Sequence, residues 1–277
     1  MNKKQKALNC VLACVLVFFA SYEKVMAEDP VSKTESESDL AKATQNPVAD
    51  LISLPFQNNT NFGLGPNDNK EQNILNIQPV IPINLGPVNL INRTIAPIIY
   101  QPPLAPGMND KFGLGDINTT FFISPAKAGK LIWGVGPIIS FPTATDDVLG
   151  TGKLSLGPSL VVLVMPGNVV TGFLVNNLWS VAGEGDRPKV NQFLLQPFVN
   201  YNLPEGWYFT SAPIITANWE VENDNRWVIP IGGGLGKVFK IAKQPMNANV
   251  QAFYNVERPE GGPDSTLRFT IQFLFPK

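Results

Sequence analysis

The sequence contains no histidine, and its only two cysteines, Cys10 and Cys14, lie close to the N-terminus. Histidine is the commonest general base in enzymes and the commonest protein ligand of metal ions. Its absence argues against an enzyme, and we expect no catalytic residue, no metal and no cofactor. The formal net charge is only −1, which gives no electrostatic support for nucleic-acid binding.

Long apolar runs are also scarce, because no stretch of 18 consecutive apolar residues follows Ala27. The N-terminus has three lysines, an apolar run from Ala7 to Ala20 and small residues up to Ala27, which is the pattern of a cleaved signal peptide over 1–27. The alternative of a lipoprotein modified at Cys14 is disfavoured, because apolar residues continue beyond that cysteine. We therefore expect an exported chain without a membrane-spanning helix.

Two regions follow the signal peptide. Residues 28–50 are polar and rich in Glu, Ser and Lys, and we interpret them as a periplasmic N-terminal segment or a small plug. Residues 51–277 consist of runs that mix apolar and amide side chains, broken by clusters of Gly, Pro, Asp and Asn. That alternation is typical of strands and turns, so this region is predicted to be an all-β domain.

The breaks in the second region alternate between long, charged loops and short turns. The long loops are 66–72, 101–111, 142–153, 180–190, 219–226 and 257–265. The short turns are 84–89, 124–130, 165–168, 203–206 and 240–246. Outer-membrane barrels combine an even strand number with short periplasmic turns and longer outer loops. We therefore predict an antiparallel transmembrane (outer-membrane) β-barrel of about 12 strands, with both ends in the periplasm.

Alternation within the strands predicts which side chains face the interior. In 190–203, 247–257 and 267–275, apolar residues form one phase and amides dominate the other. A membrane barrel presents its apolar phase to lipid and can keep a polar interior. The predicted lumen-lining residues are Gln192, Gln196, Asn200, Asn249, Gln251, Asn255, Arg268 and Gln272. Twelve strands enclose a narrow lumen, which the 28–50 segment or Phe198 and Phe253 could close.

All five tryptophans fall at the ends of predicted strands. Amphipathic aromatic rings collect at the two membrane interfaces of such barrels. The predicted interface residues are Trp133, Trp179, Trp207, Trp219 and Trp227. The alternative is that all five belong to a core and lie near turns by coincidence.

Prolines recur inside the predicted strands, where each one removes a backbone hydrogen-bond donor. They are Pro79, Pro97, Pro137, Pro158, Pro197, Pro213 and Pro230. A closed barrel has no edge strand to hold them, so we predict bulges or tight bends at these positions.

Four stretches of the chain resemble a known bacterial family: 40–59 (LAKATQNPVADLISLPFQNN), 113–116 (GLGD), 124–127 (SPAK) and 272–276 (QFLFP). They resemble the outer-membrane proteins of the "MetA-pathway of phenol degradation" type, whose members are often labelled transporters. The resemblance covers nearly the whole mature chain. It implies an outer-membrane β-barrel for the passage of aromatic or other small compounds, and it provides no catalytic motif.

The expected function is a passive pore or uptake channel for small compounds, including aromatic and hydrophobic ones, in the bacterial outer membrane. Expected partners are outer-membrane lipid, the barrel-assembly machinery and an unidentified small solute. The alternative is a barrel without transport, a structural or surface-interaction protein that uses its acidic loops. A soluble propeller is disfavoured, because each repeat of a propeller needs four strands and each repeat here supplies two.

Overall fold

The computed structural model describes residues 37–276 except 106 and 128. The helices are α2 (Glu37–Thr44) and the 3-10 helices η1 (Asp147–Leu149), η2 (Pro204–Gly206) and η3 (Asn223–Asn225). The strands are β1 (Ile52–Leu64), β2 (Lys70–Ile77), β3 (Val80–Asn84), β4 (Val88–Gln101), β5 (Lys111–Leu114), β6 (Ile117–Pro125), β7 (Leu131–Phe141), β8 (Lys153–Val164), β9 (Val169–Gly183), β10 (Asn191–Asn202), β11 (Trp207–Ser211), β12 (Ile215–Asn218), β13 (Trp227–Ile241), β14 (Gln244–Glu257) and β15 (Ser265–Phe275). The predicted signal peptide lies outside the described residues. Within them, no helix is both long and apolar enough to cross a membrane.

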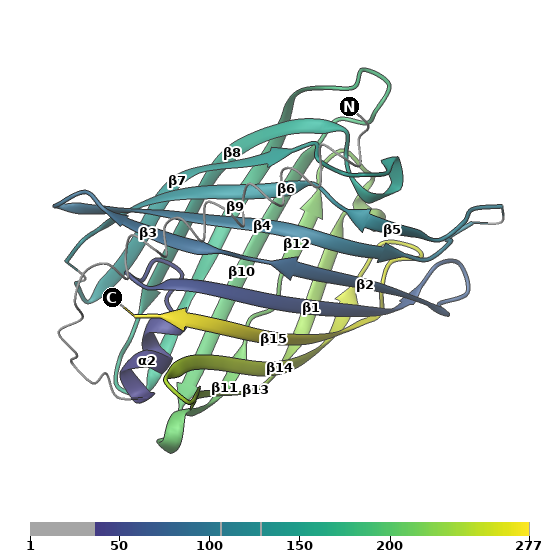
Figure 1. Cartoon of the computed structure of the whole chain (residues 1–277). Helices are drawn as coiled ribbons and strands as arrows, with labels where there is room; N and C mark the ends of the chain where they lie inside the picture. Colours follow the sequence, from purple (N-terminus) through teal and green to yellow (C-terminus); the bar gives the residue numbers. More distant parts are fainter. Residues whose placement is uncertain (1–36, 106, 128, 277) are drawn as a thin grey trace.

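The strands form one closed antiparallel barrel (Figure 1). β1 pairs with β15, so the first and last strands of the barrel meet, and hydrogen-bonded neighbours continue around the wall. The pairs β2/β3, β5/β6 and β11/β12 are each one interrupted strand: β2 and β3 share both neighbours, as do β11 and β12, and β5 and β6 share the neighbour β4. The segments therefore make a 12-strand antiparallel barrel, and the predicted fold class is confirmed.

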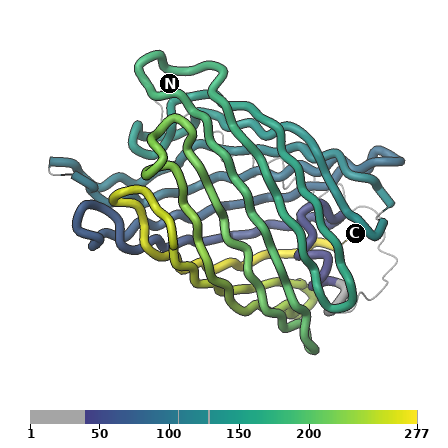
Figure 2. The backbone as a smooth tube through the Cα atoms, turned by 180° about the vertical axis from the view of Figure 1, so that it is seen from behind, coloured from purple at the N-terminus to yellow at the C-terminus, as the bar shows by residue number. Residues whose placement is uncertain are grey.

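The connections alternate as the sequence predicts. The long loops gather at one end of the barrel, which we call the loop end (Figures 1 and 2). The short turns, α2 and the end of β15 lie at the opposite end, which we call the turn end (Figure 1). Up-and-down strand order produces this segregation, because every second connection returns to the same end.

Burial follows the predicted alternation. In β15, Arg268 and Gln272 are buried, whereas Leu267 and Phe269 are 44% and 49% exposed. In β14, Gln251 is buried and Tyr254 is 60% exposed. A water-soluble β-protein shows the opposite arrangement, with apolar side chains inside. The wall therefore has an apolar outer face and a polar interior, as a barrel surrounded by lipid requires.

Each interruption of a strand faces a proline on a neighbouring strand. The break after Ile77 lies beside Pro55, whose carbonyl accepts from the Gln78 amide (2.9 Å). The break before Ile117 lies beside Pro97, whose carbonyl accepts from the Gly115 amide (2.9 Å). Because proline has no N–H, the hydrogen bonds between two strands can stop at such a position without leaving a buried donor unpaired.

The third interruption, 212–214, follows the same rule. β10 pairs with β12 over residues 192–195 and with β11 over residues 199–202, so the stretch between them, which neither segment pairs, contains Pro197. The prolines therefore mark positions where a strand stops pairing with the neighbour on one side. Pairing continues on the other side, where Pro197 faces Phe173 of β9.

The predicted bulges are present at only some of the strand prolines. Irregularities occur at Pro79, Pro213 and Pro230, which lie in two interruptions and at a register shift. The register also changes by one residue opposite Pro97, where residues 96–97 of β4 face residues 115–117 between β5 and β6. No register shift accompanies Pro137, Pro158 or Pro197, and the predicted bulge is absent at those three positions. The physical reason is that a strand can accommodate proline where a neighbour offers no acceptor, without adding a residue.

Candidate functional site in the barrel interior

A large cavity lies toward the loop end of the barrel interior. Its volume is about 1110 Å³, and we call it the loop-end cavity. Aliphatic side chains such as Ile95 and Ile138 share its wall with amides such as Gln192 and Asn218. Cavities of a few hundred to about 1,000 Å³ with apolar walls and a few polar groups are typical of sites for small organic molecules.

A second cavity of about 210 Å³, the turn-end cavity, lies between the barrel wall and the N-terminal segment. Residues of that segment, including Gln45 and Ala49, line it on one side. Strand residues line the rest, and amide and hydroxyl groups are frequent among them, as in Thr270 and Asn247. The two cavities therefore differ in polarity as well as in size.

Five side chains line both cavities, and we call them the boundary ring. They are Gln57, Gln78, Arg93, Leu174 and Gln196. Arg93 is the only ionisable residue of the ring, and its Nη2 donates to Gln78 Oε1 at 2.8 Å. Any solute that passes from one cavity to the other must pass these side chains.

The structure places most of the predicted lumen residues on the two cavities. Gln192 lines the loop-end cavity, and Gln196 lines both. The residues on the turn-end cavity are Asn200, Asn249, Gln251, Arg268 and Gln272. Asn255 lines neither, because it is buried beneath the loop after β14, where its Nδ2 donates to the Pro263 carbonyl at 2.7 Å.

Sequence reasoning missed Gln57, Gln78 and Arg93. The available signal was Arg93, a single charge that alternates with Ile91 and Ile95 in an otherwise aliphatic phase. If that phase faced outward, the charge of Arg93 would lie in lipid. The phase that contains Arg93 is therefore the one that faces the barrel interior.

Interior side chains hold one another in a chain of hydrogen bonds. Tyr208 donates from its hydroxyl to Asn247 Oδ1 at 2.7 Å, and Asn247 donates to Gln272 Oε1 at 3.2 Å. Arg268 donates to Asn59 Oδ1 at 2.9 Å and to the Ala212 carbonyl at 2.8 Å. Buried amides that satisfy one another in this way form a rigid wall rather than a fluid one.

The described part of the 28–50 segment docks inside the turn end. Leu40 and Ala41 of α2 pack in one buried cluster with Tyr208, Val238 and Leu274 of the barrel. These contacts fix the helix against the interior face of three strands, β11, β13 and β15. Figure 1 shows α2 at that end of the barrel.

Two further contacts anchor the residues after the helix. Val48 is 4% exposed and belongs to a cluster that includes Phe122, Val161 and Phe198 from different strands. Gln45 and Asn202 exchange two amide hydrogen bonds, of 2.8 and 3.1 Å. The segment therefore fills much of the lumen at the turn end. Phe198 and Phe253 also point into the interior, where both are buried.

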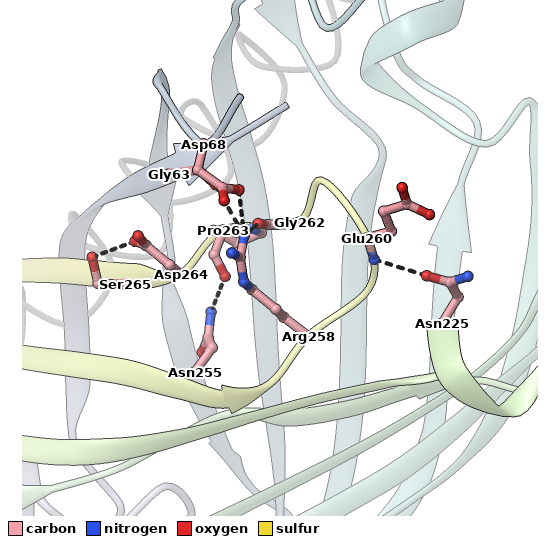
Figure 3. Close-up of polar contacts among 10 residues, drawn as sticks. All are labelled: Gly63, Asp68, Asn225, Asn255, Arg258, Glu260, Gly262, Pro263, Asp264 and Ser265. Atoms are coloured by element: carbon pink, nitrogen blue, oxygen red, sulfur yellow. Dashed lines mark hydrogen bonds and ion pairs between the residues drawn. The ribbon is translucent and has the colours of Figure 1, made fainter. Parts of the chain in front are cut away.

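The loop between β14 and β15 is tied to two neighbouring loops at the mouth of the loop-end cavity (Figure 3). Arg258 donates to Asp68 Oδ1 at 3.0 Å and to the Gly63 carbonyl at 3.2 Å. The Glu260 amide donates to Asn225 Oδ1 at 2.8 Å. Glu260 also lines the cavity, so this loop helps to shape its entrance.

The ion pair at this mouth changes the titration of its acid. The hydrogen bond from Arg258 lowers the pKa of Asp68 below its ordinary value of 3.8. The same hydrogen bond raises the pKa of Arg258. Both groups are therefore charged over the whole physiological pH range.

The five tryptophans are distributed over both ends of the wall. Trp133 and Trp207, close to short turns, are 39% and 44% exposed, and Lys237 Nζ lies 4.7 Å from the ring centre of Trp207. Trp179 and Trp219, close to long loops, are 45% and 38% exposed. Trp227 packs edge-on against Trp219 with 5.5 Å between ring centres. Their membrane-interface role stays a prediction.

Comparison with known proteins identifies the fold but no sequence family. No family model matches the sequence, and no curated protein matches it. Among solved structures, the COG4313 outer membrane channel from Pseudomonas putida F1 is similar, with a TM-score of 0.64 and 14% identity over 90% of this chain and 100% of that chain. The chain has the fold of an outer-membrane β-barrel. The family resemblance of the sequence is supported only at this coarser level.

Two further solved structures share the barrel type more loosely. The toluene transporter TodX from P. putida has a TM-score of 0.43 and 8% identity, over 88% of this chain and 93% of that chain. The outer membrane phospholipase A from Escherichia coli has a TM-score of 0.42 and 14% identity, over 88% of this chain and 99% of that chain. These similarities are too low to assign an activity to the barrel.

Proposed function

We propose that this chain is an outer-membrane channel that carries small organic solutes, aromatic and hydrophobic ones included, through the barrel interior. The observation that supports it best is the loop-end cavity of about 1110 Å³, which meets the 210 Å³ turn-end cavity at the boundary ring. Its wall combines aliphatic side chains with amides, which suits a molecule with an apolar body and a polar group. The P. putida channel is a precedent for this fold in a channel.

In this proposal the loop end faces the outside of the cell and the turn end faces the periplasm. Outer-membrane barrels have long loops outside and short turns inside. A solute would enter beside the loop that carries Glu260, pass Arg93 and leave past the N-terminal segment. Lipid surrounds the apolar wall, and the barrel-assembly machinery inserts the exported chain.

The N-terminal segment acts as a plug in this proposal. Its docked position fills the turn end, so release of a solute requires the segment around Val48 to move. The interior works by binding and passage, without chemistry on the solute.

Liposome swelling with a small sugar tests the channel. The wild-type protein is expected to conduct slowly, and a variant that lacks 28–50 but keeps its signal peptide should conduct several times faster. A control variant with a shortened 184–189 loop, which lines neither cavity, should behave as the wild type. If neither the wild type nor the plugless variant admits any solute, the channel proposal is wrong and the non-transport barrel is favoured.

A further inference from the structure

Two arginines of the barrel interior have no acidic partner among the described residues. Arg93 on β4 and Arg268 on β15 both line the turn-end cavity. Arg93 donates to Gln78, and Arg268 donates to Asn59 and to the Ala212 carbonyl, all of which are neutral. No Asp or Glu is among the described residues that line this cavity. The cavity therefore carries two positive charges that no carboxylate of its wall balances.

Both guanidinium groups keep hydrogen-bond donors for a ligand. A guanidinium has five N–H donors in a planar fork, of which Arg93 uses one and Arg268 two in these contacts. No side-chain nitrogen of Arg93 or Arg268 is both buried and without a hydrogen-bond partner, whereas Nε of Arg226 is. Their remaining donors are therefore not buried without a partner, and both side chains line the cavity. Phe253 contacts Arg268, because its ring centre lies 4.8 Å from that guanidinium.

An acidic side chain of the loop-end cavity, Asp116, has hydrogen-bond partners of its own. Asp116, on the loop-end cavity, accepts hydrogen bonds of 2.7 Å from both the amide and the hydroxyl of Thr151. It also accepts one of 3.2 Å from the Ala144 amide. A positive charge in a wall of low dielectric attracts an anion strongly, so the charge of the pair is available to a solute.

The position of Arg93 decides what kind of anion fits. Arg93 belongs to the boundary ring, so an anionic group bound to it leaves the rest of its molecule in the loop-end cavity. There the molecule would lie against Ile95, Ile138 and Leu174. A planar carboxylate matches the two parallel donors of a guanidinium, whereas inorganic phosphate has no apolar body to place against these side chains.

We propose that Arg93, assisted by Gln78 and Arg268, binds the carboxylate of a small monocarboxylic acid whose aromatic or aliphatic body occupies the loop-end cavity. This inference rests on the proposed channel function and names the class of solute that the channel takes.

Calorimetric titration of the full mature chain in detergent tests the site with benzoate, hexanoate, benzamide and inorganic phosphate. Benzoate should bind at least about tenfold more tightly than benzamide, its neutral analogue of similar shape, because hydrogen bonds between charged groups are stronger than neutral ones. Arg93→Gln should reduce benzoate affinity to that of benzamide, and Arg93→Lys should retain part of the difference. The control is Lys237→Gln, which removes a positive charge beside Trp207 at a residue that lines neither cavity and should leave benzoate binding unchanged.

Heat-modifiable migration on a gel shows which variants fold. If Arg93→Gln does not fold, the titration is repeated with Arg268→Gln. Equal wild-type affinity for benzoate and benzamide, or unchanged benzoate binding in the folded Arg93→Gln variant, would overturn the site. Phosphate binding as tight as benzoate binding would overturn the choice of a monocarboxylic acid. Sugar-driven swelling separates this inference from the channel proposal. Swelling without preferential binding of benzoate would contradict only the carboxylate site. Benzoate binding without swelling would contradict only the channel proposal.

Discussion

Replacement of Val48 by aspartate should release the N-terminal segment and open the turn end of the barrel. Val48 is 4% exposed and sits in a cluster of aliphatic and aromatic side chains that come from the strands. A carboxylate there would have no described partner of opposite charge in the cluster. No strand pairing involves residue 48, so the barrel itself should remain closed.

The magnitudes favour release over retention. Loss of the buried valine removes about 1.5–3 kcal/mol, and burial of an unpaired carboxylate costs several kcal/mol more. The two amide hydrogen bonds between Gln45 and Asn202 retain about 1–3 kcal/mol in total. Burial of Leu40 contributes another 1.5–3 kcal/mol or so. The perturbation therefore equals or exceeds the contacts that oppose it.

A second variant reaches the same end from the barrel side. A Cβ atom on Gly134 of β7 would lie 2.8 Å from Val48 Cγ1, so Gly134→Val fills the space that Val48 occupies. The control is Val148→Asp, which makes the same change at a residue that is 44% exposed in η1.

Sugar-driven liposome swelling and tryptic cleavage at Lys42 measure the outcome. Val48→Asp and Gly134→Val should both swell several times faster than the wild type and be cleaved faster at Lys42, while Val148→Asp should match the wild type. If both variants fold, swell at the wild-type rate and protect Lys42 equally well, the docked segment does not close the lumen.

Three other consequences can be measured directly. Gly236→Ala should destabilise the barrel by about 1–3 kcal/mol and so lower its unfolding temperature, because the new Cβ would lie 2.1 Å from the Tyr208 ring. An unfolding temperature equal to that of the wild type, measured by heat-modifiable migration on a gel, would contradict this. A variant that keeps only Trp207 should be quenched more by lipids brominated near the headgroup than by lipids brominated deep in the chain, and the reverse order would remove it from the interface. Since Arg258 lowers the pKa of Asp68, the ion pair persists above pH 3.8 and is lost as the pH falls through the lowered pKa. A spin label in the 65–69 loop should therefore become mobile only below that pH, and in Asp68→Asn it should be mobile throughout.

The barrel was predictable from the sequence because local chemistry specifies its connections. Clusters of Gly, Pro and Asp end strands wherever they occur, so all eleven connections fall at predicted positions. The alternation in 247–257 and 267–275 gave the correct face for Gln251 and Arg268, because period-2 patterning follows from strand geometry alone.

The interior site was less accessible to such reasoning, because it depends on contacts between distant parts of the chain. Nothing local to Val48 indicates that it docks among residues of β4, β6, β8, β9 and β10. Gln78 belongs to a gap between two strand segments, and only the fold places it beside Arg93. The pairing of each strand interruption with a proline on another strand is likewise a property of register, which single-strand patterns do not contain.

The assignment of amides to the lumen also has an exception that explains its limits. Arg93 and Ile95 line the loop-end cavity, so Thr94 between them points to the outer face of β4. Its partner across the ladder is Thr119, and their hydroxyls lie 2.9 Å apart. Asn92, on the same face, donates to Thr119 at 2.9 Å.

These three side chains put polar groups on the face that the rule reserves for apolar residues. A membrane penalises a polar group that lacks a partner rather than polarity itself, and here each hydroxyl and amide has a partner on an adjacent position of the ladder. Alternation therefore identifies the two faces of a strand, but neutral polar side chains alone do not show which face is the lumen. In β4 a single charge, Arg93, is the better guide, because neutral partners on the outer face would not offset the cost of placing a guanidinium in lipid.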